Sequence, residues 1–291
     1  MRRGLVWLLG IYAFILLLVS GVVAPLVYVL MQHLASVTSL EWVNYLAHKP
    51  LCQYVDRFRM VGFFCMLPYV CKISGIRLRD LGIRFNIWKY LLAFCGGCLL
   101  WVGLFLVFVI KVDGISRRLN TVNSLLVIFL AAFFLAIVEE VVFRGVIFEF
   151  LKKKYTKSTS LFLLACIFAC LHFSFCEPAI AKNVFIQSLL CAYYSIVDIF
   201  VHIRWPYFCC LFLLSYILAY FRLFFNSLWC SIGFHQGLVF VLMLIRKKCE
   251  FGILVNRFWG TGRVTDAWCT VFVLLVIVSI LTVFHQMNER R

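Results

Sequence analysis

Long apolar segments recur along this chain, and they constrain its fold more than any other feature. A helix needs about 20 apolar residues to cross the ~30 Å hydrocarbon core of a bilayer. Nine segments reach or approach that length, at residues 5–31, 58–73, 87–110, 124–150, 159–176, 184–203, 207–222, 226–245 and 267–285. The second is short and contains Pro68, so we expect it to be kinked or re-entrant. The pattern predicts an all-α polytopic bundle of about eight spanning helices.

The composition supports a membrane location. Of the 291 residues, 65% are hydrophobic and 14% are charged, whereas a soluble domain has roughly 25% charged residues. Arg2 and Arg3 precede an apolar stretch that continues to about residue 30, which is too long for a typical signal peptide and predicts a retained first helix. We therefore expect an integral, multi-pass membrane protein surrounded by membrane lipids, in the plasma membrane if the source is bacterial.

The net charge of +16 comes from basic residues that cluster in short linkers between the apolar segments. This distribution is typical of the positive-inside rule and of attraction to anionic headgroups. It predicts that linkers 74–89, 151–158 and 246–250 face the cytoplasm, and no motif for nucleic-acid binding accompanies it. The 14 cysteines lie mostly within apolar segments without paired metal-ligand spacing, so we expect neither a zinc finger nor a disulfide framework. The many aromatic residues are expected to face lipid and the membrane interfaces, and they imply no cofactor.

Three ionisable residues interrupt the fourth apolar segment, namely Glu139, Glu140 and Arg144. A charged side chain at the centre of a bilayer costs about 2.5–3.5 kcal/mol on insertion scales, so such a group is a candidate functional site. Glu140 and Arg144 are four residues apart and can pair on one helix face. Glu139 is rotated by about 100° from Glu140. The spacing therefore predicts a structural Glu140–Arg144 pair and a second carboxylate that faces a polar cavity.

Two histidines on later apolar segments complete a candidate catalytic set. His172 follows small residues on one helix face, and His235 follows serines at four-residue intervals; the preceding residues are Ala165, Ala169, Ser227 and Ser231. Polar groups on three hydrophobic helices can meet only in the bundle interior. The hypothesis is that Glu139 and His172 hold a water molecule and that His235 donates a hydrogen bond to a developing oxyanion.

The order of these motifs resembles that of the CPBP intramembrane protease family, which includes type II CAAX prenyl endopeptidases and bacteriocin-immunity-like proteins. The motifs are Glu139-Glu140 with Arg144, Phe168 with His172, and Leu228-Trp229 before His235. The resemblance covers roughly Ser124 to Ile245. It divides the chain into N-terminal transmembrane helices (1–123), a catalytic core (124–245) and a C-terminal linker with the last helix (246–291).

The resemblance implies an endopeptidase that hydrolyses a peptide bond of a membrane-associated protein or peptide, such as a lipid-modified one, without bound metal. Glu139 and His172 would activate water, His235 would help form the oxyanion hole, and Glu140, Arg144 and Phe168 would support them. The family pattern places Asn or Asp four residues after the last histidine, where this chain has Val239. Losing one oxyanion donor costs roughly 10²–10³ in rate; the candidate substitutes are Gln236, Ser231 and Asn226.

Other interpretations stay open at this stage. Val239 favours a non-catalytic membrane scaffold or immunity-like binding protein that retains the fold. The Glu139, Glu140 and Arg144 cluster alone is also compatible with a salt-bridged trio that stabilises helix packing. Glu139, His172 and His235 form an adequate zinc ligand set by residue type, although no HExxH motif is present. A proton-relay transporter would use the buried carboxylates differently.

Overall fold

The computed structural model describes residues 10, 13–15, 17–109, 122–172, 183–201, 203–248, 265 and 267–289. Within these residues every secondary-structure element is helical and no strand occurs, which confirms the predicted all-α class. The elements are η1 (Val19–Val23), α2 (Ala24–Val37), α3 (Glu41–Ala47), α4 (Leu51–Ser74), η2 (Leu78–Leu81), α5 (Ile87–Val109), α6 (Val122–Glu140), η3 (Val141–Ile147), α7 (Phe148–Lys152), α8 (Lys157–His172), α9 (Val184–Val201), α10 (Trp205–Phe225), α11 (Leu228–Lys248) and α12 (Trp268–Glu289).

Apolar helices of two lengths occur within the described residues. Five are long and apolar enough to cross a membrane, at Ala13–Val37, Ile87–Leu106, Ser124–Lys152, Trp205–Phe225 and Leu228–Ile245. Three more are apolar but shorter, at Lys157–His172, Val184–Tyr194 and Trp268–Phe284. The chain is therefore a multi-pass integral membrane protein. The segment around Pro68 belongs to α4, which continues from Leu51 to Ser74 with the proline inside the helix.

The chain divides into two compact units, and each is described separately. The first comprises residues 1–70 and 170–203. Its core joins α2, α4 and α9 through Ala24, Val55 and Cys191, with Tyr28 and Tyr54 packed edge to face. The short helix α3 is tied to its neighbours because Gln32 Nε2 and Tyr54 Oη donate to carbonyls at its C-terminal end.

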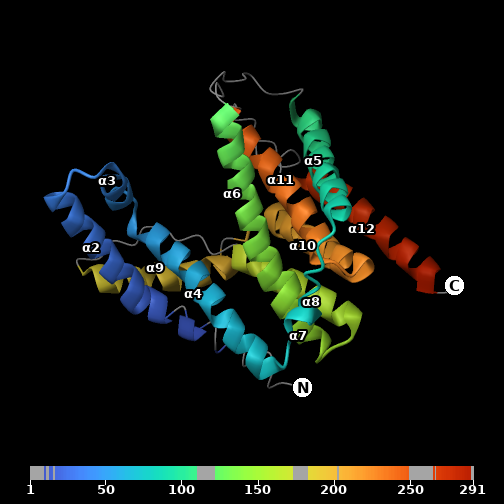
Figure 1. Ribbon diagram of the computed structural model, residues 1–291, viewed down its shortest axis with the longest axis horizontal. Coiled ribbons are helices and arrows are strands. Elements are labelled where there is room, and N and C mark those ends of the chain that lie inside the picture. The colour runs from blue at the N-terminus through green and yellow to red at the C-terminus, as the bar shows by residue number, and fades with distance from the viewer. Residues whose placement is uncertain are drawn as a thin grey trace. The chain divides into compact units, whose positions relative to one another are not determined.

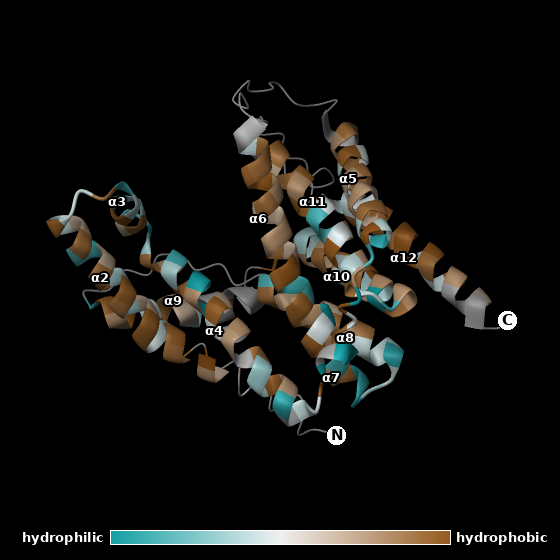
Figure 2. Cartoon of the chain, viewed as in Figure 1, coloured by the Kyte–Doolittle hydropathy of each residue, from teal (hydrophilic) through white to brown (hydrophobic). Residues whose placement is uncertain are grey.

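The second unit comprises residues 71–169 and 204–291 and contains the glutamate and His235 motifs. Here α11 lies between α5 and α6 and also contacts α10, while α12 packs on α10 (Figure 1). A core of large apolar side chains from α5, α10, α11 and α12 holds these helices together, and Trp101 is its largest fully buried member. Hydrophobic residues cover most of the helices, whereas hydrophilic ones gather near the α7–α8 turn (Figure 2).

The hydrophilic end of this unit is built from turns. Gly75 ends α4 at φ 60°, and Asn226 joins α10 to α11 at φ 45°; both lie in the left-handed region where Gly and Asn are favoured. Lys153 Nζ donates to the carbonyls of Ser74 and Gly75 at 2.9 and 2.7 Å. Two of the basic linkers predicted for one membrane side therefore contact each other. The two compact units are defined by packing and do not test the predicted domain boundaries at residues 123 and 245. Those boundaries stay a prediction.

Candidate active site

The two glutamates end α6 and are followed directly by a π-helical segment. Glu139 and Glu140 are its last residues, and η3 carries Arg144 in its middle before α7 continues the same rod. π-Helical turns inside α-helices occur frequently at functional sites. Glu140 and Arg144 are fully buried, and the side chain of Glu139 is 13% exposed. The ionisable groups of this segment, which carry the highest free-energy cost in a bilayer, are thus enclosed by protein.

Glu140 and Arg144 form the pair that their spacing predicts. Arg144 Nη1 donates to Glu140 Oε1 at 3.0 Å. The other terminal nitrogen, Nη2, reaches α10, where it donates to Ser215 Oγ at 3.0 Å and to the Ser215 carbonyl at 3.4 Å. The guanidinium carbon lies 4.5 Å from the centre of the Phe168 ring, within cation–π distance. Arg144 therefore links η3 to α8 and α10 as well as to its own glutamate.

His235 on α11 lies between both carboxylates. Its Nδ1 is 2.8 Å from Glu140 Oε1, and its Nε2 is 3.8 Å from Glu139 Oε2. The sequence predicted separate roles for the two glutamates, with Glu140 belonging to Arg144. The separation is incomplete because one imidazole faces a carboxylate at each of its nitrogens. A hydrogen bond that fixes one ring nitrogen determines what the other can donate or accept.

The charges in this cluster nearly balance. With both glutamates ionised, Arg144 charged and His235 neutral, the formal charge is −1; one further proton makes the cluster neutral. Breaking a buried ion pair on one side is strongly unfavourable, because it leaves a charge without compensation in a low dielectric. The cluster also holds unused hydrogen-bonding capacity, since Glu140 Oε2 and Arg144 Nε are buried without a hydrogen-bond partner in the described part of the chain.

Close packing of α11 against α5 positions His235. Gly233 and Gly237 flank His235 and Gln236, and a Cβ at either glycine would lie 2.3 Å from a carbonyl oxygen of α5, at Tyr90 or Phe94. Such a distance is not tolerated, so only glycine permits this backbone contact. The GxxxG spacing is typical of transmembrane helices that approach closely. On the opposite side, α6 packs on α11 through the fully buried Ala136.

The second motif contributes Phe168 and His172 on α8. Phe168 is buried and packs edge to face on Phe143, next to its contact with Arg144. His172 is the last residue of α8 and follows Phe168 by about one turn on the same helix face. It lies beyond residue 169, where the second compact unit is interrupted. The role of His172 therefore stays a prediction, while Phe168 is placed beside the glutamate helix.

Val239 lies one turn after His235 and is half-buried. Each of the three candidate substitutes for its missing donor has a hydrogen-bond partner outside the carboxylate–histidine cluster. Ser231 Oγ donates to the Leu218 carbonyl at 2.9 Å. Gln236 accepts a hydrogen bond from Tyr90 Oη and donates to the Phe129 carbonyl at 3.4 Å. Asn226 precedes His235 by more than two helical turns and accepts from Arg222 Nη1 at 3.1 Å.

Two residues of this region escaped the sequence analysis. Ser215 is fully buried against Arg144, and Tyr90 is hydrogen-bonded to the residue next to His235. A lone serine in the apolar segment 207–222 was the available signal for the first, but its partner lies on another helix. Among the described residues, no group of three or more His, Cys, Asp or Glu side chains has the arrangement of a metal site.

The fold and the cluster define a polytopic membrane protein with a carboxylate–histidine–arginine site buried among its helices. Residues 121–241 match the family model described as type II CAAX prenyl endopeptidase, Rce1-like. This match agrees with the predicted resemblance and covers the segment that carries all three motifs. No curated protein and no solved structure matches the chain.

Proposed function

We propose that this protein is an intramembrane endopeptidase that hydrolyses a peptide bond through a water molecule activated by Glu139. The supporting observation is the convergence of Glu139, Glu140 and His235 from two hydrophobic helices, within the segment that matches the family. A structural ion pair requires only Glu140 and Arg144. The second carboxylate and the imidazole add acid–base chemistry that helix packing does not require.

Glu139 is the general base in this proposal, with His172 as the second group that holds the water. Glu139 Oε2 and His235 Nε2 are 3.8 Å apart, so the oxygen of one water molecule can lie about 2.8 Å from both of them. Glu139 takes a proton from the water as the oxygen attacks the carbonyl carbon, and delivers it to the leaving amine. His235 Nε2 donates to the oxyanion when the ring carries both protons.

Glu140 and Arg144 hold His235 in place rather than react. The 2.8 Å contact of Glu140 with Nδ1 favours a proton on that nitrogen and fixes the plane of the ring. Arg144 compensates the charge of Glu140 and is itself held by Ser215 and Phe168. Preorganised groups of this kind lower the barrier because they need no reorientation when charge develops.

The family match and the membrane location support one substrate class as the first choice. The matching family model is described as a type II CAAX prenyl endopeptidase, and a site on spanning helices suits a protein end that carries a lipid. We therefore take a prenylated peptide ending in a CAAX sequence as the first probe. The second candidate function is a non-catalytic scaffold or immunity-like binding protein, which Val239 favours because it removes an expected oxyanion donor.

The test is cleavage of this peptide by purified protein in lipid nanodiscs, with the released C-terminal fragment measured by mass spectrometry. We expect wild type to release the fragment, and Glu139→Gln and His172→Ala to reduce the rate by at least about 100-fold, since each removes a group that handles the proton. Glu41→Gln is the matched control, because Glu41 is exposed in α3.

Unchanged cleavage by Glu139→Gln would overturn the mechanism. Absence of cleavage by folded wild-type protein, both with this peptide and with a library of membrane-anchored peptides, would favour the scaffold.

A further inference from the structure

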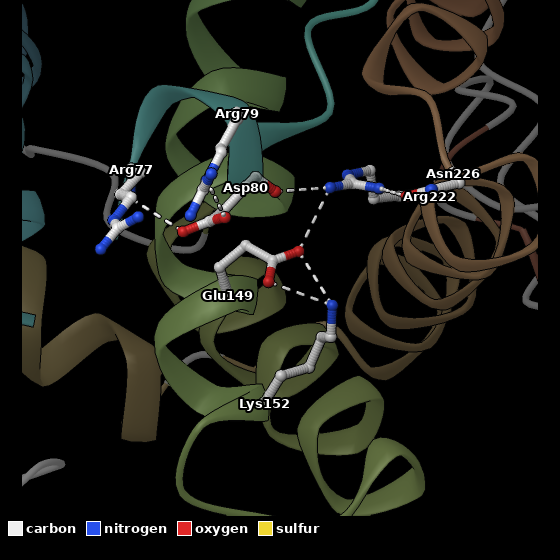
Figure 3. Close-up of polar contacts among 7 residues, drawn as sticks. All are labelled: Arg77, Arg79, Asp80, Glu149, Lys152, Arg222 and Asn226. Atoms are coloured by element: carbon white, nitrogen blue, oxygen red, sulfur yellow. Dashed lines mark hydrogen bonds and ion pairs between the residues drawn. The ribbon is translucent and has the colours of Figure 1, made fainter. Parts of the chain in front are cut away.

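A second buried ionic cluster surrounds Arg222 near the end of α10. Its Nη2 donates to Glu149 Oε1 of α7 at 3.2 Å and to the Asp80 carbonyl at 2.8 Å, and its Nη1 donates to Asn226 Oδ1 at 3.1 Å (Figure 3). The Arg222 side chain is 5% exposed. Glu149 also accepts two hydrogen bonds from Lys152, one turn away on its own helix. One guanidinium thus joins α7, α10 and the linker that precedes α5.

The linker packs directly against this guanidinium at Gly82. A Cβ at Gly82 would lie 2.6 Å from Arg222 Cζ, and the residue has φ 68°. Glycine is therefore required both by the conformation and by the contact. The same stretch of linker holds the start of α11: the Gly82 carbonyl accepts from Leu228 N at 2.9 Å, and the Ile83 carbonyl accepts from Trp229 Nε1 at 3.2 Å.

These contacts join the two helices that carry the candidate active site. Glu149 follows Glu140 by nine residues on the continuous helix formed by α6, η3 and α7, a distance of roughly 13 Å. Leu228 precedes His235 by seven residues on α11, roughly 10 Å away. The helices are therefore attached at two levels, through Glu140 and His235 at the site and through Glu149, Arg222 and the linker near the bundle end. Two attachments restrict both rotation and sliding of α11 relative to the glutamate helix, whereas a single hydrogen bond would not restrict both.

Burial of this cluster is hard to explain by stability alone. Replacing a buried ion pair with apolar side chains of similar volume is often neutral or stabilising, whereas such pairs can specify one packing register. The directional bonds of Arg222 fix a linker, a helix turn and a carboxylate at once, which apolar contacts would leave free to slide.

We propose that Arg222 is a positioning residue, which sets the register of the His235 helix against the glutamate helix through Glu149 and Gly82. It touches neither substrate nor the reacting atoms, so its effect passes through the geometry at His235. This proposal rests on the proposed function for its kinetic consequence, but the position of His235 can be measured without any substrate.

The first measurement is the ¹⁵N signal of His235 in protein labelled at its six histidines. The signal is assigned as the one missing from His235→Gln. We expect Arg222→Gln and Glu149→Gln each to shift it, and the double variant to resemble either single one because the two residues act as one unit. Lys152→Gln is the matched control: it removes a partner of the same carboxylate but leaves every contact between α7 and α10 in place.

The second measurement is the cleavage assay. We expect Arg222→Gln to lower kcat by roughly 10- to 100-fold with KM changed less than about twofold, since a displacement of about 1 Å in catalytic geometry costs this much. Gly82→Ala provides an independent disruption, because its Cβ displaces the guanidinium while all charges remain. It decides the question if Arg222→Gln fails to fold.

The outcomes separate the two proposals. An unchanged His235 signal in folded Arg222→Gln and Gly82→Ala would overturn the positioning role, whether or not the wild type cleaves a peptide. A shifted signal together with no cleavage by wild type would uphold the positioning role and reject the proposed activity.

Discussion

The Arg144 guanidinium provides the most direct test of how the buried charges are stabilised. In Arg144→Gln the carboxylate of Glu140 stays fully buried but loses its 3.0 Å ion pair, and Ser215 and Phe168 lose their cationic partner. Removing one member of a buried pair typically costs about 3–5 kcal/mol. At about 2–4 °C per kcal/mol for a large domain, the midpoint of thermal unfolding falls by roughly 6–20 °C.

Two further variants separate charge compensation from lost contacts. Arg144→Gln/Glu140→Gln removes both charges of the pair, so position 140 no longer holds an uncompensated carboxylate, and we expect it to regain at least about 2 kcal/mol relative to Arg144→Gln. Ser215→Ala removes one acceptor at 3.0 Å, and a hydrogen bond to a charged group contributes about 1.5–3 kcal/mol. The expected order of stability is wild type, Ser215→Ala, the double variant and Arg144→Gln.

The assay is reversible unfolding of the purified protein in mixed micelles of mild detergent and SDS, followed by tryptophan fluorescence and repeated as a thermal scan. Helical content before unfolding shows whether each variant starts from the same fold. If Arg144→Gln and the double variant unfold at the same SDS fraction, Glu140 gains nothing from the positive charge, and the explanation by charge compensation is wrong.

Three further predictions concern other parts of the molecule. Gly233→Ala and Gly237→Ala each place a Cβ 2.3 Å from a carbonyl oxygen of α5. Each should lower the free energy of unfolding by about 1–3 kcal/mol and reduce the cleavage rate, as measured by the same unfolding and peptide assays. Val239→Asn should raise kcat at least about tenfold by adding a donor near His235; an unchanged kcat would exclude position 239 from the oxyanion hole. The backbone N–H of Arg77 donates to the Asp80 carboxylate and holds its pKa below the ordinary value. Asp80 therefore stabilises the fold at neutral pH, and this contribution is lost as the pH falls through the folded pKa. In thermal scans, Asp80→Ala should lose less stability on acidification than wild type.

Local helical periodicity explains why some of the site could be predicted from sequence. The i, i+4 spacing of Glu140 and Arg144 determines that they share a helix face, and the structure pairs them. The stripe of Ser227, Ser231 and His235 lies on a buried face for the same reason. Such relations depend only on the geometry of one helix, which the apolar segments establish before any tertiary contact is known.

Relations between helices depend on information that one helical wheel does not contain. The contact of His235 with Glu140 as well as Glu139 depends on where α11 lies beside α6, which Gly233 and Gly237 determine through the backbone of α5. The π-helical segment η3 also changes the angular positions of the side chains directly after the glutamates, and no residue in Val141–Ile147 predicts this change. Arg222 was simply one more basic residue at the end of an apolar segment until its partners were known.

The magnitude of the oxyanion term decides how strongly Val239 favours a scaffold. With Ser231, Gln236 and Asn226 engaged elsewhere, His235 Nε2 is the side-chain donor that α11 directs toward Glu139. Loss of one donor costs roughly 10²–10³ in rate. Enzymes accelerate their reactions by roughly 10⁶-fold or more, so a protease that lacks this donor would still exceed the uncatalysed rate by at least about 10³. Val239 therefore predicts slow hydrolysis that Glu139→Gln abolishes, whereas a scaffold predicts a rate that Glu139→Gln leaves unchanged.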